Sequence, residues 1–143
     1  MASRHLSIRI DPASFERLER ESHRMRMSRS EVARTLLEEG LRMEAHPGIV
    51  FRDGPTGRRA AVSGGPDVWE VIGGFPEGDF RDEAVKYVAE FVSLPEWKIR
   101  AAVDYYREFR EEIDERIRLN DEATAEGYAE WLRTQQAPAE RSA

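Results

Sequence analysis

The amino-acid sequence predicts a mainly α-helical protein with a short β-ribbon, built as two modules and a tail. Apolar and polar side chains alternate strictly over residues 4 to 10, which is typical of a strand with one buried face. Much of the remaining chain carries apolar residues at helical spacing between capping residues. Turn residues around two short apolar segments near residue 50 predict a small hairpin. We expect modules at residues 1–44 and 45–136 and a frayed tail at 137–143.

The predicted N-terminal strand has an apolar face and a polar face. The apolar face carries Leu6, Ile8 and Ile10, and the polar face carries His5, Ser7 and Arg9. Asp11-Pro12 ends the strand as a helix cap followed by a first-turn proline, so no second strand follows. A lone strand leaves backbone donors and acceptors unpaired, so we expect it to pair antiparallel with the same strand of a second copy.

Two helices are expected after the strand. Residues 12 to about 24 are expected to form a helix with one buried stripe at helical spacing, namely Phe15, Leu18, Ser22 and Met25. Ser28 and Glu31 then have the spacing of a capping box. We expect this box to open a second helix that buries Val32, Leu36, Leu37 and Leu41.

A two-stranded ribbon has the size of a DNA major groove, and its polar face would carry the residues that read bases. Arg9 is the best candidate, because its guanidinium can bond both acceptors of guanine, whereas Ser7 is permissive and His5 could reach only phosphate. The alternative is an exposed strand face that binds no ligand. A solvent-exposed face of this kind has few other uses in a strand that needs a partner.

The order strand, helix, capped helix over residues 4 to about 43 resembles the ribbon-helix-helix family of DNA-binding proteins, many of which are repressors or antitoxins. The resemblance implies an intertwined homodimer whose bases are read by His5, Ser7 and Arg9. It also implies a phosphate at the start of the second helix, held by Ser28, Arg29 and Ser30. Arg26 stands where the family usually has glycine, so we expect either a left-handed arginine or a different turn.

Composition limits the classes of function. The chain has no cysteine, so disulfides and thiolate metal sites are excluded. No apolar run approaches membrane-spanning length and the start shows no signal-peptide pattern, so a cytoplasmic protein is expected. The net charge of −6 is divided unevenly, because residues 1–43 carry nine basic and seven acidic side chains, and residues 44–143 carry 13 and 21. The basic excess belongs to the module expected to bind DNA.

The second module is expected to hold the hairpin, a short helix capped by Asp67, and a helix from about Arg81 that buries Ala84, Val85, Val88, Phe91 and Val92. Ser93 is expected to cap one long helix from Pro95 to about Leu119. Charged pairs four residues apart should support that helix: Arg107 with Glu111, Glu112 with Arg116, and Asp114 with Arg118. A last helix, from about Asp121 to Gln135, groups Tyr128, Trp131 and Leu132 as a candidate anchor for a protein partner.

Four motifs of the second module occur in the order of a known domain family of unknown function. They are His46-Pro47-Gly48-Ile49, Val68-Trp69-Glu70-Val71-Ile72, Ala101-Ala102-Val103-Asp104-Tyr105-Tyr106 and Glu111-Glu112-Ile113-Asp114. The family that they resemble is found in antitoxins encoded beside toxins with a PIN-like ribonuclease fold. The resemblance therefore implies a PIN-like toxin as partner. The segment from Arg52 to Arg59 departs from the family, which usually has a glycine-rich stretch there.

The sequence offers no recognisable catalytic motif. The three histidines fit no metal spacing, and the carboxylates from Glu108 to Glu115 are expected to form a solvated helix face rather than a metal or acid–base site. We therefore expect no cofactor and no catalysis. The expected function is that of an antitoxin that represses its own promoter and neutralises a ribonuclease toxin. The alternative is a stand-alone regulator whose second module senses a ligand or oligomerises.

Overall fold

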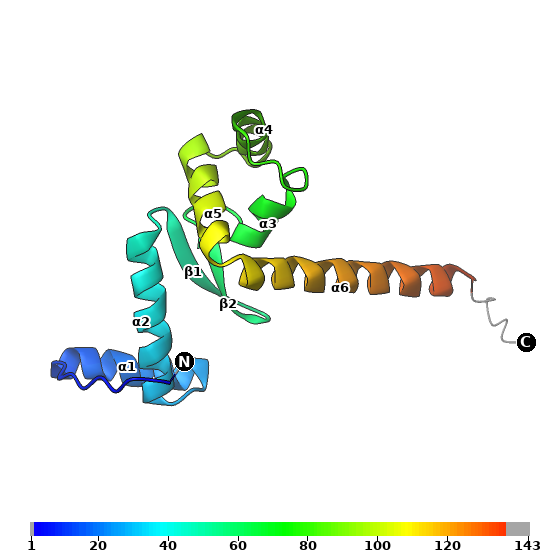
Figure 1. Cartoon of the computed structure of the whole chain (residues 1–143). Helices are drawn as coiled ribbons and strands as arrows, with labels where there is room; N and C mark the ends of the chain where they lie inside the picture. The colour runs from blue at the N-terminus through cyan, green and yellow to red at the C-terminus, as the bar shows by residue number, and fades with distance from the viewer. Residues whose placement is uncertain (1, 137–143) are drawn as a thin grey trace, which may run out of the picture. The chain divides into compact units, whose positions relative to one another are not determined.

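The computed structural model describes residues 2–136, which form a mainly helical chain with one two-stranded antiparallel hairpin (Figure 1). The elements, in order, are α1 (Pro12–Met25), α2 (Arg29–Ala45), β1 (Ile49–Gly54), β2 (Gly57–Val62), α3 (Val68–Gly73), α4 (Asp82–Val92), α5 (Glu96–Glu108) and α6 (Arg110–Gln136). By its contacts the chain divides into two compact units, Met1–Ala45 and His46–Ala143. The expected tail, residues 137–143, lies outside the described residues.

The start of α1 confirms its prediction. The Asp11 carboxylate accepts a hydrogen bond from the backbone N–H of Ser14 at 2.8 Å, and Pro12 is the first helical residue. The backbone N–H and the hydroxyl of Ser14 hold the pKa of Asp11 below its usual range. The helix ends at Arg26, which has the left-handed backbone (φ 55°) and whose N–H bonds the carbonyl of His23 at 3.3 Å. Of the two turns foreseen, the left-handed arginine is the one that forms.

The cap of α2 is also confirmed, because the Ser28 hydroxyl accepts from the backbone N–H of Glu31 at 3.1 Å. The predicted burial of its apolar residues is wrong for three of four. Val32 is buried, whereas Leu36, Leu37 and Leu41 are 38%, 51% and 59% exposed. Within this unit α2 packs on α1 alone, and a helix pair can cover only one side of each helix.

Residues 2–11 form neither a helix nor a strand in the single chain. A strand requires backbone hydrogen bonds to a neighbouring strand, and the described chain offers none to this segment. Its apolar side chains are uncovered: Leu6 is 66%, Ile8 71% and Ile10 45% exposed. The expected partner strand would have to come from outside the chain.

The hairpin and the first helix of the second unit agree with the predictions. Ile49 pairs with Val62 at its base and Gly54 with Gly57 at its tip. Asp67 and Glu70 form a capping box at the start of α3. The Asp67 carboxylate is buried and ion-paired with Arg59 at 2.8 Å and Arg52 at 3.1 Å. This network ties both strands to α3, so the segment that departs from the family pattern has a structural role.

Helix α4 begins as predicted, but its end differs from the prediction in two ways. Phe91 was expected in the core and is 79% exposed, because it lies on the outer side of α4, one turn after the exposed Tyr87. Ser93 does not cap the next helix. It takes the left-handed conformation (φ 57°) that ends α4, and Pro95 is the N-terminal cap residue of α5.

The predicted single helix from Pro95 to Leu119 is wrong, because the chain breaks at Phe109 (φ −115°, ψ 43°). The break lets both α5 and α6 contact α3, and the segment expected as a separate last helix continues α6 without interruption. The expected charged pairs are replaced. The Tyr105 and Tyr106 hydroxyls donate to Glu112 at 2.9 Å and Asp114 at 2.6 Å. Arg107 pairs with Asp104, Arg118 with Glu115 and Glu122, and Arg116 bonds Thr56.

Candidate nucleic-acid interface

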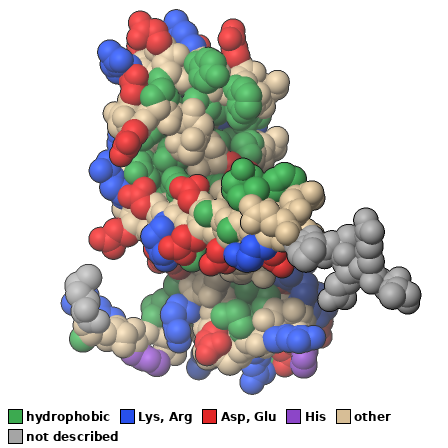
Figure 2. Space-filling model, turned by 90° about the vertical axis from the view of Figure 1, so that its right-hand side faces the viewer, with side chains coloured by type: hydrophobic (Ala, Val, Ile, Leu, Met, Phe, Trp, Pro, Cys, Tyr) green, Lys and Arg blue, Asp and Glu red, His purple; other side chains and the backbone are tan. Residues whose placement is uncertain are grey.

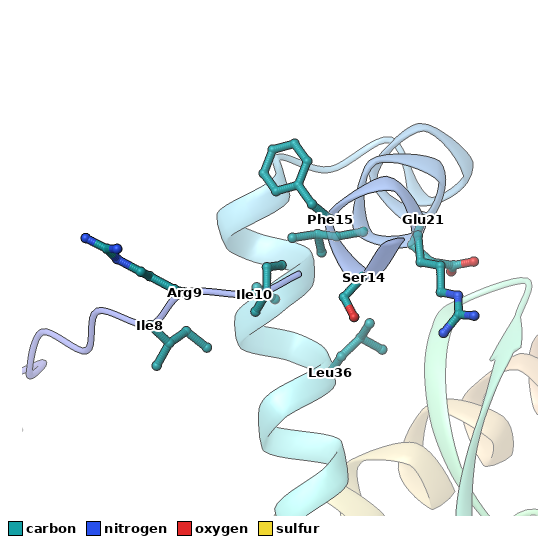
Figure 3. A pocket seen from close by; sticks show the side chains of 10 residues that line it. Ile8, Arg9, Ile10, Ser14, Phe15, Glu21 and Leu36 are labelled. Atoms are coloured by element: carbon teal, nitrogen blue, oxygen red, sulfur yellow. The ribbon is translucent and has the colours of Figure 1, made fainter. Parts of the chain in front are cut away.

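The first unit has an apolar surface that is left uncovered, whereas the second unit has a core of its own. Ile8, Ile10, Phe15 and Leu36 line an open hollow of about 710 Å³ between the N-terminal segment and the two helices (Figure 3). Val32 is the one apolar residue that is fully buried among the described residues of this unit. The second unit, by contrast, has a continuous core of 17 buried residues shared by the hairpin and helices. The first unit is therefore a helix pair without a core of its own.

The three candidate base-reading residues lie in the segment that borders this hollow. His5, Ser7 and Arg9 are exposed, and within the described chain none of them makes a hydrogen bond or an ion pair. Figure 3 shows the Arg9 side chain pointing away from Ile8. Arg9 also lines the hollow beside Ile8 and Ile10 in the single chain, so separate polar and apolar sides remain a prediction for the paired strand.

The candidate phosphate-binding residues lie at the start of α2. Ser28, Arg29 and Ser30 are exposed. The Ser28 hydroxyl is already engaged as the helix cap. The Arg29 guanidinium pairs with Glu19 of α1 at 3.1 Å and lies 5.0 Å from the centre of the Phe15 ring. A phosphate at this helix start would therefore compete with Glu19 for Arg29.

The candidate partner residues lie at the far end of α6. Tyr128 and Trp131 are 62% and 54% exposed, and Leu132 is half-buried. The two aromatic rings stack with their centres 5.9 Å apart. Both aromatic residues belong to α6, the helix that also contains the core residue Ile113. Unlike Ile113, they are exposed and do not pack against another element.

One contact between a buried histidine and an exposed glutamate was not singled out from the sequence. His46, at the start of the second unit, is buried, and its Nε2 lies 2.5 Å from a carboxylate oxygen of Glu108 at the end of α5. The rings of Tyr105 and Phe109 lie edge-on to the imidazole. The contact spans 62 residues, so no local spacing could have indicated it. The contact joins the first residue of the second unit to the end of α5, next to the break between α5 and α6.

Within residues 2–136 no group of three or more histidine, aspartate or glutamate side chains is placed to hold a metal ion. None of the helices there is both long and apolar enough to cross a membrane. Comparison with protein-family models, with curated proteins and with solved structures gave no match to this chain.

Proposed function

We propose that this protein binds double-stranded operator DNA as a homodimer and represses its own promoter. In the proposed dimer the N-terminal segments of two copies pair into a ribbon. His5, Ser7 and Arg9 of each copy face the major groove, and the start of α2 at Ser28 to Ser30 meets a phosphate.

The observation that carries this proposal is the uncovered apolar row Leu6, Ile8 and Ile10. Leaving three aliphatic side chains in water forgoes roughly 1.5–3 kcal/mol each relative to full burial. The exposed Phe15 and Leu36 of the two helices line the same hollow as Ile8 and Ile10. Pairing with a second copy would cover this surface and satisfy the unpaired backbone of the segment at once.

We also propose that the second unit neutralises a toxin protein, as the resemblance to antitoxin-associated domains implies. A PIN-like ribonuclease is the expected class of toxin. The exposed Tyr128–Trp131 pair, on a unit with an excess of acidic side chains, supports this proposal. The protein itself would perform no catalysis under this proposal.

The DNA part is tested by electrophoretic shift of the fragment upstream of the protein's own gene, with a scrambled fragment of equal length as control. We expect a shift at nanomolar protein and competition by operator alone. Equal affinity for both fragments would contradict specific binding. The toxin part is tested by co-purification with the product of the neighbouring gene. A chain that binds its operator but not that product would be a stand-alone regulator.

A further inference from the structure

Helix α6 extends well beyond the core that its first part covers. Ile113 is buried and Ile117 packs on the core, but none of the residues from Arg118 to Gln136 is buried. We call residues 118–136 the α6 overhang. At 1.5 Å per residue it spans about 28 Å, and Figure 1 shows it running away from α3, α4 and α5.

One side of the overhang continues the side of α6 that packs on the core. The helical period places Thr124, Tyr128 and Trp131 in line with Ile113 and Ile117. Figure 2 shows hydrophobic side chains among the charged ones on this face of the molecule. Asp121 is the one charged residue of the overhang on that side. The other charged residues of the overhang lie outside this stripe: Arg118, Glu122, Glu126, Glu130 and Arg133.

A helix in this position needs a cover to be stable. Most helical stability in proteins comes from packing of an amphipathic face, and Asn120, Thr124 and Gly127 lower the helix propensity of the overhang. The stacked Tyr128 and Trp131 rings are the kind of rigid aromatic side chains that anchor interfaces. A stripe whose one charged residue is Asp121, on one side of an otherwise charged helix, fits the groove of another protein.

The net charge of α6 indicates which kind of protein the overhang could bind. Helix α6 carries eight acidic and four basic side chains, so two copies laid side by side would repel each other. A basic partner would be attracted instead. Resting on the proposed function, we infer that the α6 overhang docks through Tyr128 and Trp131 into an apolar groove of a second, basic protein, which presents a lysine or arginine to Asp121.

The test measures binding of the full chain to the purified product of the neighbouring gene by calorimetry, with two matched pairs of variants. Trp131→Ala should weaken binding about 30-fold or more, whereas Leu119→Ala, an exposed residue on the other side of α6, should change it less than about twofold. Asp121→Lys should weaken binding more than about tenfold and Glu126→Lys less than about threefold, although both change the net charge equally. Amides of residues 118–136 should exchange more slowly in the complex.

Unchanged melting temperature and unchanged operator binding in all four variants would show that the fold and the DNA-binding unit are intact. Equal losses for Trp131→Ala and Leu119→Ala would overturn the assigned face, and equal losses for the two lysine variants would overturn the contact at Asp121. Self-association through α6 that Trp131→Ala abolishes would make a second copy the occupant. If the wild-type chain does not bind the product of the neighbouring gene, both the docking of the overhang and the proposed toxin partner are wrong. The proposed DNA binding is tested separately, by the affinity for the operator.

Discussion

Arg9 is the residue on which sequence-specific binding most depends in the proposed complex. It is exposed and makes no ion pair in the described chain, so its guanidinium needs no internal partner to be broken before it contacts a base. A bidentate bond to guanine needs two donors in a fixed plane, which arginine has and lysine lacks.

We expect Arg9→Ala to cost about 1–3 kcal/mol in operator binding and to relax the preference at one base pair in each half-site. Shifts with operators randomised at single positions measure this. Arg9→Lys is the control, since it should keep the salt dependence while losing the base preference. An Arg9→Ala protein that binds its operator as tightly as wild type at the same salt would rule out the ribbon as the reading element.

Arg26 illustrates a different constraint at the residue scale, because its backbone is left-handed (φ 55°) without being glycine. The Cβ atom of an L-residue approaches the following carbonyl in this conformation, which costs roughly 1–2 kcal/mol. Two backbone hydrogen bonds of the turn, from Arg26 to His23 and from Met27 to Ser22, depend on the conformation, so the turn is retained despite the cost.

Arg26→Gly should therefore raise the free energy of unfolding by about 0.5–1 kcal/mol, once the greater flexibility of glycine in the unfolded chain is subtracted. Thermal and urea unfolding measure the change. Arg26→Ala keeps the Cβ atom and should give no such gain. Equal stabilisation by both substitutions would show that loss of the charge, and not relief of the backbone, is responsible.

At the scale of elements, the break between α5 and α6 is held by hydrogen bonds from two neighbouring tyrosines to carboxylates of the next helix. The Tyr106 hydroxyl donates to Asp114 at 2.6 Å, and the Arg110 guanidinium lies 5.2 Å from the centre of its ring. Burial, together with the hydrogen bond to Asp114, raises the pKa of Tyr106 above its usual value. The folded chain therefore keeps the phenolic proton at a pH where the unfolded chain releases it.

It follows that the contribution of Tyr106 is complete below pH 10, the usual pKa of tyrosine, and is lost as the pH rises above it. Tyr106→Phe should cost about 1 kcal/mol at pH 8 from the lost hydrogen bond. It should also lose less stability than wild type between pH 10 and 11. Urea unfolding at several pH values checks both. Tyr87→Phe, at an exposed position, is the control, and an identical alkaline loss in wild type and Tyr106→Phe would contradict this account.

At the scale of the whole molecule, the two units differ in what they need. The second unit has its own core, whereas the first has a single buried apolar residue among those described and an uncovered apolar surface. Units of about 40 residues usually need a partner, a metal or a disulfide to be stable. The absence of cysteine removes the disulfide, so association with a second copy is the simplest remedy.

Ile8→Lys should abolish dimerisation and operator binding together, since it would place an unpaired charge inside the paired ribbon. Sedimentation of the full chain at micromolar concentration measures the first, and gel shift the second. Ser7→Lys adds the same charge to the polar side and should leave the dimer intact. A wild-type chain that is folded and monomeric at this concentration would contradict the ribbon.

Local spacing was sufficient for the elements whose signals lie within a few residues. The caps at Asp11, Ser28 and Asp67 rest on side chains that bond the adjacent backbone, so the sequence alone could predict them. The hairpin and the approximate beginning of α4 could be predicted from the turn residues and the apolar spacing along the sequence. The alternation of residues 4–10 and the split of charge between the modules are likewise properties of the sequence.

Tertiary packing decided the rest. The break at Phe109 is invisible to a helical period, because it exists to let both α5 and α6 contact α3, and the His46–Glu108 pair joins residues 62 positions apart. Phe91 satisfies a helical pattern, yet the core ends before reaching it. The exposure of Leu36, Leu37 and Leu41 has the same origin, since periodicity identifies an apolar face but only the surrounding structure determines whether anything covers it.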